Sequence, residues 1–182
     1  MKPYTGKGDD GKTSDLTGSR IWKDDYLIEV IGTIDEATAS IGLAKGFIKD
    51  SNLIKLLELV EYDLYVINTD ILNSSNKKKK NQKLLRVTKE MVNRLEKEIL
   101  NYNNELKPLT KFISVGGMPQ VSTMHLARTI VRRVERRIVT LSKEKEINPN
   151  IISYLNRLST LLFVLSRYIS KQENINEKSI SK

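Results

Sequence analysis

The sequence contains no cysteine and only one histidine, His125, among its 182 residues. Disulfide bonds and thiolate metal sites are therefore excluded, and so is a metal site built from several histidines. No apolar run approaches the roughly 20 residues that a helix needs to cross a bilayer. The opening residues, MKPYTGKGDD, lack the apolar core of a signal peptide. We therefore expect a cytoplasmic protein with no membrane segment.

Aromatic residues are also scarce, at 6% of the chain, although the formal net charge is +9. A basic surplus can serve nucleic acid or small polyanions, and it can also be no more than a well-solvated surface. Few rings are available for base stacking, and no DNA- or RNA-reading motif accompanies the charge. We expect no nucleic-acid partner, and a strongly salt-dependent affinity for duplex or RNA would contradict this.

Helical periodicity runs through most of the chain, and no segment has the alternation of a strand. The pattern predicts helices from Asp25 to about Lys49, from a cap at Asn52 to Ile71, from Thr88 to near Asn104, from Pro119 to Ser142, and from Pro149 to Ile169 or beyond. Short connections between them favour an all-α, five-helix bundle in one domain. We expect an N-terminal arm at 1–24, a helical domain at 25–171 and a disordered polar tail at 172–182.

One stretch of the fourth expected helix, HLARTIVRRVERR, places several charged residues together. Arg128, Arg132, Glu135 and Arg136 fall in one quadrant with His125, next to an apolar stripe. A guanidinium beside a packing seam is costly unless an anion lies opposite. The pattern therefore predicts a phosphate, or a carboxylate of a partner subunit, on this face.

The N-terminal segment GKGDDGKT matches the written pattern of a P-loop, but no strand pattern precedes it and no helix pattern follows it. We therefore expect no P-loop fold. The chemistry of the segment remains: Gly6 and Gly8 let backbone amides approach an anion, and Lys7, Thr13 and Ser14 supply donors. A mobile terminus without a ligand is the alternative.

Three segments together resemble the PduO-type ATP:corrinoid adenosyltransferases. They are YTGKGDDGKTSDLTGSRIWKDD in the arm, EVIGTIDEATASIGLA in the first expected helix, and FISVGGMPQVSTMHLARTIVRRVERR followed by YLNRLSTLLFVLSRY in the last two. Their order and spacing agree with the family over residues 4–170. The resemblance implies a homotrimer of helical bundles in which ATP and the corrinoid meet at subunit interfaces.

The resemblance also implies a reaction. The cobalt of cob(I)alamin, or of a related corrinoid, attacks the 5′-carbon of the ribose of ATP, and adenosylcobalamin and triphosphate are formed. Mg²⁺ would accompany ATP, although no magnesium ligands can be assigned. A corrinoid reductase and an adenosylcobalamin-dependent mutase are implied as partners. The rival interpretation is a trimer that carries or senses ATP and adenosylcobalamin with little turnover, because Thr160 stands where the family usually has aspartate.

The resemblance further implies the site. By position, nucleotide binding falls to Thr5, Gly6, Lys7, Gly8, Thr13, Ser14 and Lys23 in the arm, to Arg132, Glu135 and Arg136 on the fourth helix, and to Asn156 on the fifth. Catalytic roles fall to Arg132, Arg128, Asp35 and Phe112. Arg132 would stabilise the leaving triphosphate, and Asp35 would pair with Arg128 across a subunit boundary.

Phe112 would pack near the corrin and keep the lower axial position of cobalt empty, which makes cob(II)alamin easier to reduce. The alternatives are that Phe112 only anchors the loop before the fourth helix, and that Asp35 and Arg128 form only a structural salt bridge.

Overall fold

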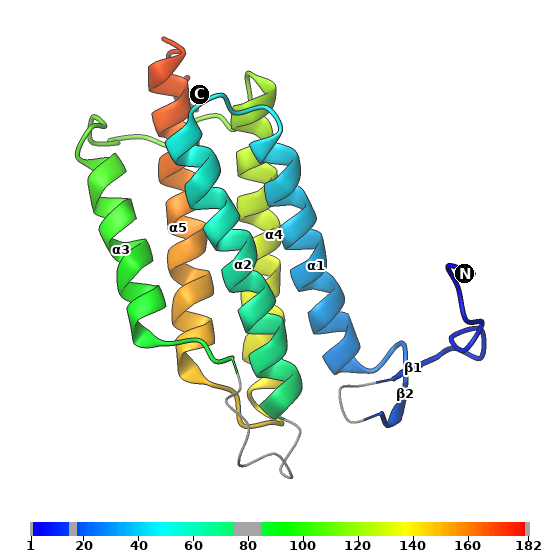
Figure 1. Cartoon of the computed structure of the whole chain (residues 1–182). Coiled ribbons are helices and arrows are strands. Elements are labelled where there is room, and N and C mark those ends of the chain that lie inside the picture. The colour runs from blue at the N-terminus through cyan, green and yellow to red at the C-terminus, as the bar shows by residue number, and fades with distance from the viewer. Residues whose placement is uncertain (1, 15–17, 75–84, 181–182) are drawn as a thin grey trace.

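Five helices and one small two-stranded sheet make up the computed structural model, which describes residues 2–14, 18–74 and 85–180. The helices are α1 (Tyr26–Lys45), α2 (Ser51–Ser74), α3 (Lys89–Asn103), α4 (Pro119–Leu141) and α5 (Pro149–Gln172). Successive helices run in opposite directions (Figure 1). Helix α4 packs against α1 and α5, α3 packs on α5, and α2 packs on α1. The predicted five-helix bundle is confirmed.

Two of the predicted helix starts are stabilised by side-chain caps. The side chain of Asp25 accepts a 2.8 Å hydrogen bond from Leu27 N at the start of α1. Thr88 Oγ1 accepts a 3.4 Å hydrogen bond from Met91 N at the start of α3. Each contact satisfies one of the backbone donors that a helix leaves unpaired in its first turn, which is why these residue types favour helix starts.

Two other boundaries differ from the prediction. The second helix begins at Ser51, and its cap is Asp50, whose Oδ1 accepts a 2.8 Å hydrogen bond from the predicted cap residue, Asn52. The first helix ends at Lys45 and does not reach Lys49. Lys49 lies in the connection to α2, outside the regular hydrogen bonding of either helix.

The core is lined by aliphatic side chains from all five helices, with one buried polar cluster among them. Tyr154 on α5 donates a 2.6 Å hydrogen bond from its hydroxyl to Asp63 Oδ2 on α2, and Arg94 on α3 forms an ion pair with the same carboxylate. Burial and the negative charge of Asp63 raise the pKa of Tyr154 well above its usual value. The hydroxyl therefore stays protonated and remains a donor.

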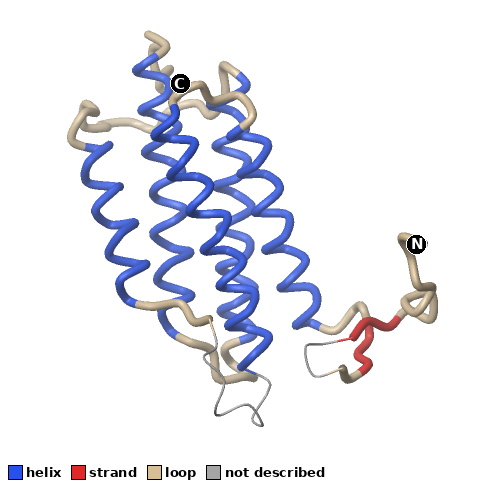
Figure 2. Tube along the Cα trace, in the orientation of Figure 1, coloured by secondary structure: helices blue, strands red, loops and turns tan. Residues whose placement is uncertain are grey.

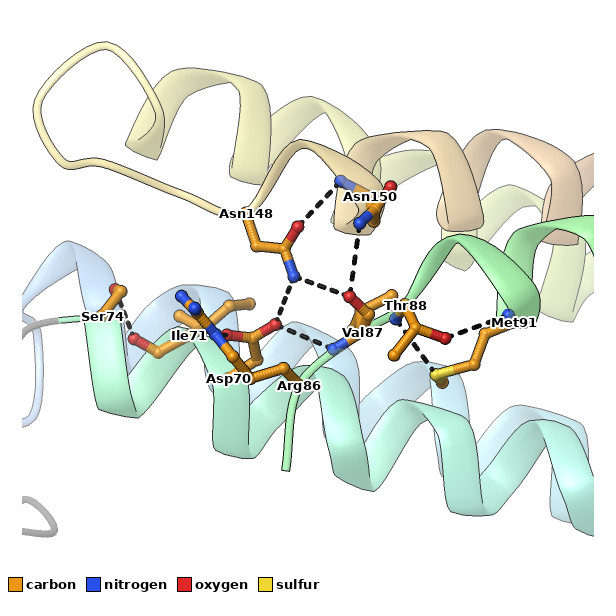
Figure 3. Close-up of polar contacts among 9 residues, drawn as sticks. All are labelled: Asp70, Ile71, Ser74, Arg86, Val87, Thr88, Met91, Asn148 and Asn150. Carbon is orange, nitrogen blue, oxygen red and sulfur yellow. Dashed lines mark hydrogen bonds and ion pairs between the residues drawn. The ribbon is translucent and has the colours of Figure 1, made fainter. Parts of the chain in front are cut away.

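A second cluster ties three helix ends together at the end of the bundle where α2 finishes (Figure 3). Asp70 Oδ2 accepts hydrogen bonds from Val87 N at 2.9 Å and from Asn148 Nδ2 at 2.7 Å. Asn148 Nδ2 also donates to Val87 O at 2.8 Å, and Asn148 Oδ1 caps α5 by accepting from Asn150 N at 3.1 Å. The last turn of α2, the approach to α3 and the start of α5 are thus fixed to one carboxylate.

The sheet is a departure from the all-α prediction. Strands β1 (Lys12–Ser14) and β2 (Arg20–Trp22) form an antiparallel hairpin within the arm (Figure 2). Arg20 Nη2 donates to Lys7 O and to Asp10 Oδ1, both at 2.6 Å, and so folds the glycine-rich turns against the hairpin. Strands of three residues are too short to produce a detectable alternation, which is why the sequence pattern missed them.

The described part of the C-terminal segment, which was expected to be a disordered tail, makes contacts with the rest of the chain. Within 172–182, residues 173–180 turn back and run beside the loop between α3 and α4, with a bridge between Ile113 and Ser179. Residues 181–182 lie outside the described residues, as does most of the lysine-rich connection between α2 and α3. Within the described ranges, every helix is too short or too polar to cross a bilayer.

Candidate functional site

Neighbouring arginines of α4 are used in two different ways. Arg133 forms an ion pair with Glu36, and Arg137 forms one with Glu29, so that both attach α4 to α1. Arg137 Nη1 also donates to Thr33 Oγ1 at 2.8 Å. The charges of these two arginines are therefore neutralised within the bundle.

The other arginine face of α4 is not neutralised. Arg128, Arg132 and Arg136 follow one another at four-residue spacing, and none of them has a carboxylate partner among the described residues. In the described part of the chain, the hydrogen bond of the Arg136 guanidinium is the one that Nη1 donates to Arg132 O, at 3.2 Å. Arg128 is half-buried, and its Nε is buried without a hydrogen-bond partner in the described structure. Three uncompensated guanidiniums in one row make a face that suits a polyanion.

Glu135 lies between two of these arginines in sequence but does not neutralise them. Its Oε1 accepts a 3.0 Å hydrogen bond from Asn156 Nδ2 on α5. Asn156 Oδ1 in turn accepts a 2.8 Å hydrogen bond from Arg157 Nη1, and Thr160 Oγ1 donates to Asn156 O at 3.2 Å. Two residues that the sequence assigned to one nucleotide site, Glu135 and Asn156, are therefore in direct contact.

An aromatic ring lies under the first arginine of the row. The guanidinium carbon of Arg128 is 6.0 Å from the ring centre of Phe163, and the His125 ring is 6.1 Å from it. Burial lowers the pKa of Arg128, with a further lowering from Arg132. Burial also lowers the pKa of His125, and the charge of Arg128 adds to this. His125 is therefore neutral near pH 7, while Arg128 keeps its charge and has no counter-ion among the described residues.

A cavity of about 550 Å³ opens beside this cluster, between α4, α5 and the loop that precedes α4. It is lined by Leu109, Thr110, Lys111, Phe112, Ile113, Val115, Arg128 and Phe163. Phe112 is 88% exposed at this cavity, so it does not anchor its loop in the core. Mostly apolar walls with two cationic side chains, Lys111 and Arg128, suit a large, mostly apolar ligand that carries polar groups.

The structure places two of the predicted arm residues, Thr13 and Ser14, in β1 of the hairpin and the others in the turns that flank it, but it does not bring the arm to α4 of the same chain. The arm stands away from the bundle beside the start of α1 (Figure 1). It contains all the nucleotide-binding residues predicted in the N-terminal region: Thr5, Gly6, Lys7, Gly8, Thr13, Ser14 and Lys23. The start of α1 lies at the end of α4, because the Tyr26 hydroxyl donates to Arg137 O at 3.1 Å. The loop of Phe112 lies at the other end of the bundle (Figure 1).

Asp35 is likewise separated from its predicted partner. Its side chain is exposed on α1 and makes no ion pair with Arg128 or with any other residue of the described chain. The structural salt bridge between Asp35 and Arg128, which was the alternative interpretation, is therefore not formed within the described chain.

Sequence reasoning did not single out Phe163, Arg167 or Glu177 as parts of this region. Phe163 and Arg167 stand in the apolar run LLFVLSRY of α5, where periodicity marks them only as helix residues. Glu177 lies in the tail that was expected to be disordered. For metals, the described residues contain no group of three or more His, Asp or Glu side chains arranged to hold an ion.

Comparison with known proteins gives a consistent result. The family described as cobalamin adenosyltransferase matches residues 3–169. The corrinoid adenosyltransferase of Bacillus subtilis (strain 168) is 37% identical over 181 residues, covering 97% of this chain and 91% of that protein. Human corrinoid adenosyltransferase MMAB is 34% identical over 180 residues, covering 97% of this chain and 72% of that protein.

Among solved structures, a variant of the PduO-type ATP:corrinoid adenosyltransferase from Lactobacillus reuteri, complexed with cobalamin and ATP, superposes with a TM-score of 0.90 at 30% identity. The superposition covers 100% of both chains. The family match spans both the arm and the α4–α5 pair that carries the arginine row, and on this evidence the chain belongs to the cobalamin adenosyltransferase family.

Proposed function

We propose that this protein transfers the 5′-deoxyadenosyl group of ATP to the cobalt of cob(I)alamin or a related corrinoid, giving adenosylcobalamin and triphosphate. The observation that carries the proposal is the row of Arg128, Arg132 and Arg136, which lacks carboxylate partners in the described chain while Arg133 and Arg137 are paired. Relatives named corrinoid adenosyltransferases support it along nearly the whole chain, and one structural neighbour was solved with ATP and cobalamin together.

For this reaction the protein must bind ATP and the corrinoid, orient them toward each other, and neutralise the charge of the leaving triphosphate. The reduced cobalt supplies the electron pair of the new cobalt–carbon bond, and the pair of the broken carbon–oxygen bond leaves with triphosphate. Negative charge grows on that oxygen in the transition state, and fixed cations near it lower the barrier. We assign this role first to Arg132, with Arg136 and the arm residues Lys7 and Lys23 binding the other phosphates.

The cavity beside Arg128 is the proposed corrinoid site. Its apolar surface is provided by Leu109, Ile113 and Phe163. This surface would exclude water from the reduced cobalt and so limit side reactions of that reactive centre. Phe112 has its ring free at this cavity, where it can cover the lower axial face of the corrin and keep that position empty. An empty axial position favours reduction of cob(II)alamin to the attacking species.

We further propose a homotrimer with its sites at subunit interfaces. The arm and the Phe112 loop lie at opposite ends of one bundle (Figure 1), so a site that contains both needs more than one chain. The exposed carboxylate of Asp35 and the uncompensated charge of Arg128 are complementary, and an ion pair between them across the interface would orient Arg128.

A charge exchange tests this interface. Asp35→Arg should weaken the trimer and lower activity, and the double variant Asp35→Arg with Arg128→Asp should recover the trimer. Glu58→Arg, a charge reversal at an exposed position of α2, is the matched control. A wild-type mass of one chain by light scattering, or no recovery in the double variant, would contradict the pairing.

Mg²⁺ is proposed as the counter-ion of ATP in a cytoplasmic enzyme. Asp10 is engaged by Arg20, and the described chain offers no ready cluster of acidic ligands. The ligands of the ion would then be mainly phosphate oxygens and water, as is common for magnesium in nucleotide sites. A reductase that delivers the reduced corrinoid and a mutase that uses the product are the proposed partners.

The decisive experiment supplies Mg-ATP and chemically reduced cobalamin without oxygen, and measures adenosylcobalamin by absorbance and triphosphate by chromatography. Equal amounts of both products are expected. The rival function, a carrier or sensor with little turnover, has one observation in its favour: the Thr160 hydroxyl is bonded to the backbone of α5 and supplies no charge where the family usually has a carboxylate. Tight binding of both ligands without product would favour that rival.

A further inference from the structure

The loop that carries Phe112 is held mainly through its backbone. Residues 104–118, all of them described, contain no complete helix before α4 begins, and the Phe112 side chain is 88% exposed. Two hydrogen bonds connect this loop to the C-terminal segment: Ile180 N donates to Phe112 O, and Ser114 N donates to Lys178 O, both at 2.8 Å. The position of the ring therefore depends on where the C-terminal segment lies.

That segment is in turn fixed by a buried cation. Arg167 on α5 has only 6% of its side chain exposed, and its Nε and Nη2 donate to Glu177 Oε1 and Oε2 at 2.7 and 3.0 Å. Arg167 Nη2 also donates to Lys107 O at 2.8 Å, at the start of the loop. A two-pronged pair of this kind fixes direction as well as distance. One guanidinium thus holds both the loop and the segment that pairs with it.

The chain reverses immediately after α5 to make this arrangement possible. Asn174 has a φ of 55°, in the left-handed region that asparagine tolerates better than most residues. Ile175 N then donates to Ser170 O at 2.8 Å. The turn directs Glu177 back toward Arg167 and not away from the bundle.

We propose that Arg167 and Glu177 are positioning residues that act through residues 173–180 to hold Phe112 at the corrinoid cavity. The inference rests on the proposed function, because Phe112 acts on a corrinoid only if the cavity binds one. It assigns to the C-terminal segment a part in the reduction of cob(II)alamin. A purely structural role for the ion pair would stabilise the bundle without any link to Phe112.

Ile180→Pro tests the link without touching the buried pair. Proline removes the N–H that donates to Phe112 O, whereas Ile180→Ala keeps it and is the matched control. We expect Ile180→Pro to lower kcat about fivefold when cob(II)alamin and a reductant are supplied, the effect of losing about one hydrogen bond. The effect should be smaller with preformed cob(I)alamin, the KM for ATP should not change, and Ile180→Ala should match the wild type.

A double-mutant cycle with Phe112→Ala separates positioning from stability. If the segment acts through Phe112, then Glu177→Gln and Ile180→Pro should each lower the rate in the wild-type background and have no further effect once the ring is absent. An equal loss in both backgrounds would overturn the proposal, because the segment would then act by another route.

Amide hydrogen exchange of residues 108–118 in the free protein provides a readout that does not depend on catalysis. Exchange should accelerate in Ile180→Pro and Glu177→Gln but not in Ile180→Ala. Unchanged exchange would overturn the positioning role even if the enzyme is active. If the wild type formed no adenosylcobalamin while exchange accelerated as expected, the proposed function would fail and the mechanical link would stand.

Discussion

Asn156 on α5 donates a 3.0 Å hydrogen bond from Nδ2 to Glu135 Oε1 on α4, and this contact keeps a carboxylate away from the arginines on either side of it in sequence. Without the amide, the Glu135 carboxylate would be free to pair with Arg132 or Arg136. We therefore expect Asn156 to contribute to ATP affinity through Glu135 as well as by any direct contact.

Replacing this asparagine should therefore weaken ATP binding. In Asn156→Ala we expect the KM for ATP to rise about tenfold, because a newly formed Glu–Arg pair competes with phosphate for the same guanidinium. Steady-state kinetics in Mg-ATP measure the change. Asn156→Ala combined with Glu135→Gln should recover part of the affinity, and a double variant no better than the single one would argue for direct contact alone.

Arg132→Ala should abolish turnover while the protein stays folded. Arg132 is exposed and makes no ion pair in the described chain, so its removal costs little stability, whereas the loss of a cation beside a leaving group typically costs a factor of about 100 or more. Arg133→Ala is the control on the adjacent position: it loses the pair with Glu36 but should retain most activity. Comparable losses in the two variants would remove Arg132 from the mechanism.

Phe112→Ala should slow the reaction mainly when it starts from cob(II)alamin. The ring is free at the cavity and contributes little to the core, so the melting temperature should hardly change. Parallel assays with cob(II)alamin plus reductant and with preformed cob(I)alamin compare the two starting states. The same fractional loss in both assays would count against a role at the lower axial position.

Asp70→Ala should destabilise the bundle without a specific effect on the site. The change removes the acceptor for Val87 N and for one hydrogen bond of Asn148 in a buried place (Figure 3). We expect a cost of about 2–3 kcal/mol in the free energy of unfolding, which lowers the melting temperature by about 5–10 °C for a chain of this size. Glu58→Ala, exposed on the same helix, should change it far less.

Mild acid should destabilise the fold through His125. Because burial and Arg128 lower the pKa of this imidazole, with Glu177 opposing them, the unfolded chain binds a proton that the folded chain does not. The contribution of neutral His125 is complete above about pH 6.5, the ordinary pKa of histidine, and is lost as the pH falls toward the folded value. Denaturant titrations from about pH 7.5 to 5.5 should show the decline, and His125→Gln should flatten it.

The periodicity of the sequence was sufficient to predict the five helices and the arginine row, because both depend on which residues share a face of one helix. Arg128, Arg132 and Arg136 follow from spacing alone. The pairing of Arg133 and Arg137 with α1 does not, since it requires the packing of two helices that are distant in sequence.

The C-terminal segment and the hairpin could not have been predicted in the same way. The partner of residues 178–180 is the backbone of residues 112–114, and backbone donors and acceptors are the same for every non-proline residue. Glu177 has no distinguishing neighbours in the sequence, and its role becomes visible only when Arg167 is found opposite it. Sequence patterns detect residues that share one face of a helix, whereas this segment is held by backbone hydrogen bonds and by one ion pair between residues that are not on one face.

The division of α4 into paired and unpaired arginines also bears on how such a helix can diverge. Arg133 and Arg137 fix its attachment to α1, so substitutions at 128, 132 and 136 leave that attachment intact. Substitutions that change ligand preference on the arginine-row side of α4 therefore require no compensating substitutions on the side that packs against α1.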